Sequence, residues 1–252
     1  MLAHTRVMWL NIVGFSFMKK QLYYWIAPVT LFIVFVVFTV LVKTVDVKYF
    51  PIGENNYYLG FASMNSDVQA WVNKIGSFRL MKILSDIDLY LSFVFVIGFV
   101  GYTIYQAIKL KSLKKIDRRY YILLGTYVLV VILYFAFEVM RINYSPIVED
   151  GLKPSYPSTH VFVASVFYIA STLTAIDMIP IEKRYLRVIT IVLVVFLVLI
   201  MGFVRLLSGR HWMSDIIAGY LLAGFVLSLY AVIYRPFFKH NQEPVEEKEI
   251  EN

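Results

Sequence analysis

A short polar segment between two apolar runs holds the residue types that could carry chemistry in this chain. It contains Arg205, His211 and Asp215 within eleven residues. If a helix has begun by His211, Asp215 shares its helical face and can hold one ring nitrogen while the other points outward. Such a histidine is a candidate nucleophile or base, and Arg205 offers a fork of donors suited to phosphate or carboxylate. The same residues also fit a capped helix start with interfacial charges, and this stretch alone does not distinguish the two.

A second segment, Pro157-Ser158-Thr159-His160, precedes another apolar run. Ser158 directly after Pro157 predicts a helix start at which the serine caps the free amides of the first turn. Those amides and the helix dipole form an anion site, beside which His160 would lie. Taken alone, the segment also suits a capped helix with an interfacial histidine. Two histidines, each at the end of an apolar run and each beside anion-binding groups, favour catalysis.

The composition predicts an integral membrane protein. Hydrophobic residues make up 60% and aromatic residues 17% of the 252 residues, more than the core of a soluble domain requires. The chain has no cysteine, which excludes disulfides and thiolate chemistry. Only His160 and His211 flank apolar runs, which argues against a polyhistidine metal site. The net charge of +7 is more typical of cytoplasmic loops facing anionic lipid than of nucleic-acid binding.

Six apolar runs are each long enough to cross a bilayer, which takes about 17 to 25 residues. The sequence therefore predicts an all-α, polytopic membrane protein with transmembrane helices at 24–42, 89–108, 120–137, 161–178, 188–204 and 216–234. The polar connection 43–88 contains a candidate interfacial amphipathic helix at 67–84.

Three parts are expected along the chain. Residues 1–21 form a cytoplasmic N-terminal segment, of which the first seventeen look like an extension upstream of a natural start at Met18. Residues 22–235 form the six-helix membrane domain. Residues 236–252 form an acidic cytoplasmic tail without apolar periodicity, which predicts disorder.

Basic residues predict the orientation in the membrane. The connection 109–119 carries six basic residues against one acid, and a second basic cluster occurs at 183–187. The positive-inside rule places both connections in the cytoplasm. Both termini are then cytoplasmic, and the two histidine segments emerge together at the outer face. We expect a multi-pass cell-membrane protein whose candidate site faces outside.

On these motifs the chain resembles the type 2 phosphatidic acid phosphatase superfamily of membrane lipid phosphatases. That family carries Pro-Ser-x-His, which is complete at 157–160, and Ser-Arg-x5-His-x3-Asp, which lacks only the serine because Val204 occupies its place. The order of the motifs and their placement on six spans also agree, so the resemblance covers roughly residues 22–235.

The family's first motif, Lys-x6-Arg-Pro, departs from the pattern. Counting back from Pro146, Ser145 replaces the arginine and Glu138 replaces the lysine. Three nearby cations could substitute for them or could be ordinary interfacial charges: Arg141, Lys153 and Arg210. We therefore expect weaker phosphate affinity than in relatives that keep both cations.

The resemblance implies a mechanism without a metal or other cofactor. His211 would attack phosphorus to give a phosphohistidine, Asp215 would orient it, and His160 would protonate the leaving oxygen and then activate water. This suits phosphoryl transfer, which depends mainly on positioning and charge stabilisation. Candidate phosphate-binding residues are Arg205, Ser158, Thr159, Arg141, Ser145 and Glu138.

The expected function is hydrolysis of a phosphomonoester or diphosphate lipid, with the lipid substrate and the bilayer as partners. By analogy with bacterial members, undecaprenyl diphosphate of the cell-wall cycle ranks before phosphatidic acid and phosphatidylglycerol phosphate. Two alternatives remain. One is a weakly active or inactive relative that binds or moves anionic lipids, prompted by Glu138 and Ser145. The other is a phosphotransferase that passes the phosphoryl group to an acceptor other than water.

Overall fold

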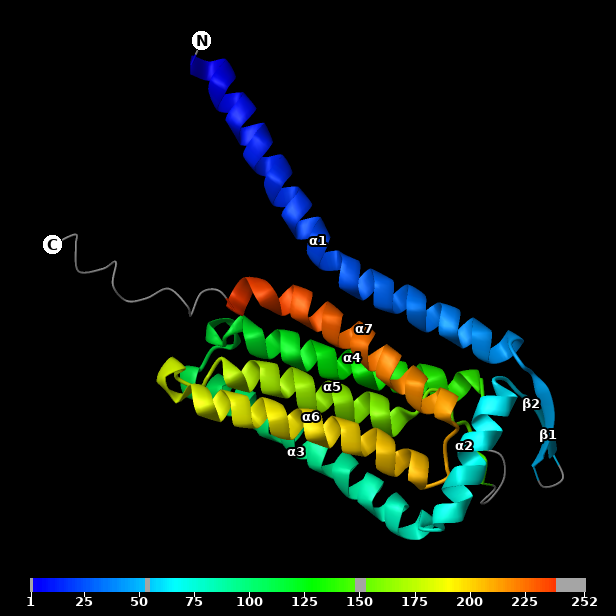
Figure 1. Cartoon of the computed structure of the whole chain (residues 1–252). Helices are drawn as coiled ribbons and strands as arrows, with labels where there is room; N and C mark the ends of the chain where they lie inside the picture. Colours follow the sequence, from blue (N-terminus) through cyan, green and yellow to red (C-terminus); the bar gives the residue numbers. More distant parts are fainter. Residues whose placement is uncertain (1, 53–54, 148–152, 239–252) are drawn as a thin grey trace.

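A computed structural model of the chain describes residues 2–52, 55–147 and 153–238 (Figure 1). Within these residues, six helices are long and apolar enough to cross a membrane. They are α1 (Leu2–Thr44), α3 (Phe78–Leu110), α4 (Arg118–Met140), α5 (Thr159–Ile176), α6 (Arg184–Leu207) and α7 (Met213–Phe238). The prediction of an all-α, six-span membrane protein is confirmed.

The structure describes the N-terminal end of the chain from Leu2 but the C-terminal end only as far as Phe238. The residues before the first span belong to α1, which is one helix from Leu2 and contains Pro28. At the other end, α7 continues to Phe238, and the predicted disorder of 239–252 lies outside the described residues.

Helix α5 is the central element of the bundle. Its apolar window is 67% buried, more than that of any other candidate span in the described part of the chain. It packs against α3, α4, α6 and α7, and Phe162, Phe167 and Val166 belong to the main core cluster. The other helices expose long apolar rows on their outer sides, as lipid-facing surfaces do. The N-terminus of α5 is therefore surrounded by other helices.

Helix α3 is much longer than the predicted span 89–108, because it begins at Phe78. The predicted helix 67–84 is wrong as a single element. Gly76 has a left-handed φ of 67° and its N–H bonds to the Val72 carbonyl, which ends α2 (Ala62–Ile75). Glycine adopts this conformation without strain, so it terminates the helix. The chain then re-enters a helix after Ser77, and residues 78–88 become the first turns of a membrane helix.

A small module that the sequence did not predict lies at one end of the bundle (Figure 1). It consists of the antiparallel hairpin β1 (Lys48–Ile52) and β2 (Asn55–Leu59), followed by α2. Asn65 of α2 accepts a hydrogen bond from the Ser214 N–H at 3.1 Å and donates to the Gly60 carbonyl at 2.9 Å. The module thereby binds one of the free amides at the start of α7.

The two basic connections lie together at the opposite end of the bundle from this module (Figure 1). Arg119, at the start of α4, forms an ion pair of 3.5 Å with Asp177, directly after α5. The polar segments after α4 and α6 consequently share the end that carries α2 and the hairpin.

Candidate active site

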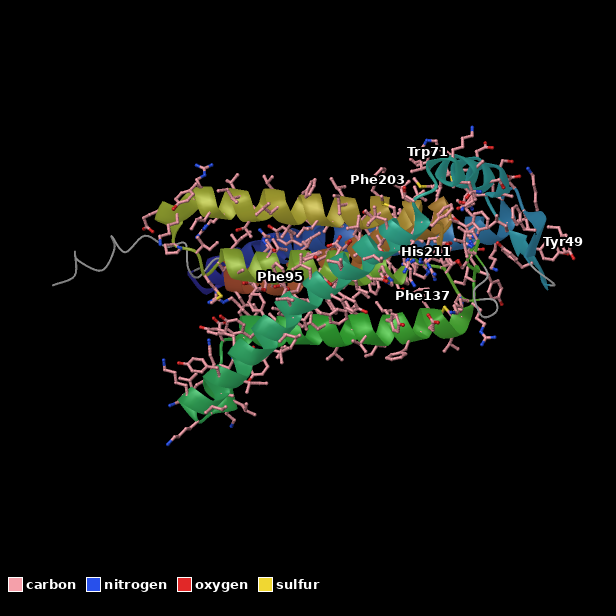
Figure 2. The ribbon with its side chains drawn as sticks, turned by 90° about the horizontal axis from the view of Figure 1, so that it is seen from below. Tyr49, Trp71, Phe95, Phe137, Phe203 and His211 are labelled. Carbon is pink, nitrogen blue, oxygen red and sulfur yellow. The ribbon has the colours of Figure 1, made fainter. Side chains whose placement is uncertain are left out.

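His211 lies in the turn between α6 and α7, at the end of the bundle next to α2 (Figure 2). The turn depends on Gly209, whose φ is 67° and whose position would place a Cβ 2.9 Å from the Phe78 ring. The His211 side chain is 6% exposed, and its Nδ1 lies 2.9 Å from the Ser155 carbonyl oxygen. A carbonyl can only accept, so Nδ1 carries the proton. Nε2 is then the nitrogen with a free electron pair.

Asp215 is fully buried beside this histidine. Its Oδ2 lies 3.7 Å from His211 Nδ1 and accepts the Trp212 N–H at 3.0 Å, while Oδ1 accepts from Asn143 Nδ2 at 3.1 Å. The bond to the Trp212 N–H is the reciprocal half of a capping box at the start of α7. Asp215 thus acts on the imidazole electrostatically, while the Ser155 carbonyl makes the shorter hydrogen bond.

Burial is the largest influence on the pKa of His211, and it lowers that pKa below the ordinary value of about 6.5. The nearby Arg205 lowers the pKa further, whereas Asp215 and the Ser155 carbonyl act in the opposite direction. The imidazole is therefore neutral at neutral pH, which is the form that can act as a nucleophile.

Ser158 is the N-cap of α5, as predicted, but the predicted side-chain cap is wrong. Its hydroxyl makes no capping hydrogen bond. This oxygen is one of a small number of buried side-chain atoms in the described residues that have no hydrogen-bond partner. Its N–H instead donates to the Asp215 carbonyl at 2.9 Å, which ties the two motif segments together. Gly219 permits this approach, since a Cβ there would lie 2.8 Å from the Ser158 carbonyl oxygen. The hydroxyl and the first amides of α5 remain available to an anion.

His160 and Arg205 complete the group, and both contact α3. His160, in the first turn of α5, has Nε2 3.2 Å from Asp86 Oδ1. Arg205, 8% exposed near the end of α6, donates from Nη1 to Ser85 Oγ at 3.4 Å, and its Nε lacks a partner within the described residues. Arg205 is close enough to interact electrostatically with both histidines. The structure thus brings together His160, His211, Asp215, Arg205 and Ser158.

The residues aligned with the degenerate first motif do not take part in the contacts of this group. Glu138 is exposed at the end of α4, and Arg141 is exposed with a left-handed φ of 47°. Ser145 is half-buried, and its hydroxyl accepts from the Ile147 N–H at 3.3 Å. In the described structure, none of the three has a hydrogen bond or ion pair to either histidine or to Arg205.

Four further residues at the site were missed in the sequence. Ser155 acts through its backbone carbonyl, which has no side-chain signal. Asn143 is a buried asparagine in a connection whose folding the sequence does not show. Ser85 and Asp86 precede the predicted second span, and the acid so close to an apolar run was the one available signal.

An apolar cavity of about 340 Å³ opens beside His160, between α3, α4 and α5. Thr159 and His160 are among its lining residues. The remaining lining is aliphatic and aromatic: Leu89, Phe93, Val130, Val131, Tyr134, Phe135, Val163 and Phe167.

Comparisons with known proteins agree with the motifs. Residues 119–239 match the model of the PAP2 superfamily. A similar solved structure is the crystal structure of the first transmembrane PAP2 type phosphatidylglycerolphosphate phosphatase from Bacillus subtilis, with a TM-score of 0.57 and 16% identity over 87% of this chain and 98% of that chain. At this identity the likeness shows the fold. The search of curated proteins found no match. In its matched region and in its fold, the chain is similar to the PAP2 superfamily of type 2 phosphatidic acid phosphatases.

Proposed function

We propose that this protein is a membrane lipid phosphatase that hydrolyses a lipid phosphomonoester or diphosphate through a phosphohistidine intermediate. The observation that carries the proposal is the apolar cavity that His160 helps to line. A lipid tail in that cavity would leave its phosphate beside His160, the start of α5 and Arg205. Pockets of this kind, largely apolar with a few convergent polar groups, are typical ligand sites.

The first chemical step is attack by His211 Nε2 on phosphorus. The Nδ1–H bond to the Ser155 carbonyl holds the ring, and Asp215 stabilises the positive charge that develops on it. The bond from phosphorus to the lipid oxygen breaks as the P–N bond forms. His160 donates a proton to the departing oxygen, which leaves as a lipid alcohol or, from a diphosphate, as a lipid monophosphate.

In the second step, His160 removes a proton from water, the water oxygen bonds to phosphorus, and the P–N bond breaks to release phosphate. Arg205, the Ser158 hydroxyl and the Thr159 amide are proposed to hold the phosphoryl oxygens throughout. Arg205 Nε and Ser158 Oγ are both buried without a recorded partner among the described residues, so each has hydrogen-bonding capacity for the substrate. These groups act without a metal, and turnover should persist in EDTA.

The test is phosphate release by purified protein from undecaprenyl diphosphate, phosphatidic acid and phosphatidylglycerol phosphate, with His211→Ala as the matched control. Undecaprenyl diphosphate is the substrate expected to react fastest. Release from a lipid by the wild type, but not by the variant, supports the proposal. A phosphoenzyme that forms but passes its phosphoryl group only to another acceptor would make the protein a phosphotransferase. Lipid binding without a phosphoenzyme would make it a binding protein.

We also propose that the site faces outside and that both termini are cytoplasmic. The support is the separation of the two ends of the bundle, with the basic connections at the end opposite His211. Because the chain has no cysteine, Asn56→Cys in β2 and Ser112→Cys between α3 and α4 each create a unique thiol. An impermeant thiol reagent on intact cells should label the first variant only. Labelling of the second alone would reverse the orientation.

A further inference from the structure

Asp86 of α3 is a carboxylate at the candidate site that the motifs do not include. Its Oδ1 lies 3.2 Å from His160 Nε2, and the side chains of Asp86 and His160 are 34% and 21% exposed. Asp86 also lies outside residues 119–239, the region that matches the family model. The contact therefore comes from a part of the chain that the family comparison does not describe.

The charges around His160 come from three elements. Arg205 of α6 interacts with it electrostatically, as do Arg210 and His211 of the α6–α7 connection. Each of these groups is positive or potentially positive. Asp86 is the carboxylate in contact with it among the described residues, and a carboxylate at this distance favours the protonated ring. A general acid must carry its proton before the leaving group departs.

We propose that Asp86 is a positioning residue for His160. It accepts the Nε2–H bond, leaves Nδ1 as the nitrogen that exchanges a proton with the substrate and with water, and stabilises the imidazolium that protonates the leaving group. This rests on the proposed phosphatase function. In catalytic triads a carboxylate orients a histidine in the same way. Here the oriented histidine is the general acid, His160, rather than the nucleophile, His211.

The placement of Asp86 is supported by its neighbours on α3. Ser85 Oγ accepts from Arg205. Asp88, three residues after Ser85, accepts the Tyr168 hydroxyl at 2.6 Å on Oδ1. One turn of α3 thus contacts the phosphate-binding arginine, the candidate acid and the middle of α5. These bonds hold the Asp86 backbone in a fixed position relative to His160.

A competing role for Asp86 predicts opposite kinetics. A carboxylate beside a phosphate site could simply repel the substrate, in which case its removal would tighten binding and leave chemistry unchanged. As a positioning residue, its removal would slow the step that needs the acid. Measurements of KM and kcat for the variant therefore distinguish the two roles.

The first experiment observes the ring directly. The protein is labelled with 15N-histidine in detergent micelles, the His160 signals are assigned with His160→Gln, and their pH titration is followed. Asp86→Asn should move the His160 midpoint to lower pH by about one unit, a tenfold change in proton affinity. Asp86→Glu should restore most of the shift. Asp67→Asn, which removes the same charge from an exposed position on α2, should leave the midpoint unchanged. A midpoint unmoved by Asp86→Asn would overturn the proposal.

The second experiment measures kcat/KM, which reports the steps up to phosphoenzyme formation. Asp86→Asn should lower it by about 10- to 100-fold for a lipid phosphate, whose alkoxide leaving group needs a proton, and by less than about threefold for p-nitrophenyl phosphate. A lower KM for the lipid with unchanged kcat would show repulsion and reject the proposal. If the wild type hydrolysed no lipid phosphate while Asp86→Asn still shifted the His160 titration, the pairing would stand and the phosphatase function would fail.

Discussion

The α6–α7 connection and the first part of the α4–α5 connection show opposite relations between motif and structure. In the former, His211 and Asp215 are buried and bonded to residues from another connection, Ser155 and Asn143. In the latter, Glu138 is exposed and the Ser145 hydroxyl bonds within its own loop. The nearly complete motif is held by several contacts, so a substitution there would leave a buried polar partner unsatisfied. The altered motif lies where substitution disturbs few contacts.

Helix α3 is a further element that contacts the site. Instead of two cations from the first motif, α3 contributes a hydroxyl at Ser85 and a carboxylate at Asp86. Neither group adds a positive charge, so we expect weak phosphate binding and a larger role for His160 as the proposed acid and base. Four substitutions test this contrast, from the largest expected effect to the smallest.

His211→Ala should abolish both the phosphoenzyme and turnover, a loss of at least about 10³-fold, because the covalent step disappears. Trapping with a 32P-labelled substrate, followed by gel analysis under alkaline conditions, would detect the phosphohistidine, whose P–N bond is labile in acid and stable in base. Substantial turnover in this variant would mean that the buried connection is not the reactive one.

His160→Ala should slow hydrolysis of lipid phosphates by about 10² to 10⁴-fold, the usual contribution of general acid–base catalysis. Formation of the phosphoenzyme from an aryl phosphate should change much less, because its leaving oxygen hardly needs a proton. Pre-steady-state bursts with both substrates measure the difference. If the phosphoenzyme vanished here and persisted in His211→Ala, the two roles would be exchanged.

Asp215→Asn should reduce kcat by about 10- to 100-fold, because the neutral amide no longer stabilises the positive charge that develops on His211. Because the pKa of His211 is lowered, the unprotonated nucleophile persists below pH 6.5, and kcat/KM should fall only at more acid pH. Asp215 acts to raise that pKa, so its removal should move this acid limb to still lower pH. A pH–rate profile of wild type and variant checks the direction, and a limb that moved upward would contradict it.

Ser145→Arg should tighten inhibition by phosphate or vanadate by about three- to tenfold, since it restores a cation at the rim of the site. The position lies two residues after Asn143, whose amide contacts Asp215. Glu138→Gln is the matched control: its exposed side chain should leave inhibition within about twofold of wild type. Unchanged inhibition in Ser145→Arg would mean that position 145 does not face the phosphate.

The six spans could be predicted because apolar runs of bilayer length have few alternatives to a helix. The motif residues could be predicted as a group because the topology requires both connections to emerge at one end. The start of α3 could not be predicted, since Gly76 and Ser77 fit either a short break between two helices or the beginning of a longer loop. Packing of α3 against α5 and α6 selects the long helix. The β1–β2 hairpin contains Pro51 and no clear alternation, so its local signal was weak.

The sequence by itself determined the membrane class, the order of the spans and the types of the candidate reacting groups, because hydrophobic length and motif spacing are local properties. Only the tertiary structure decided the partners of those groups. His211 donates to a backbone carbonyl at Ser155, and His160 contacts Asp86, which is 74 residues distant in the chain. Hydrogen bonds of this kind depend on how far each helix is shifted along its axis and how it is rotated about that axis. Both quantities are set by the packing of all the helix faces together.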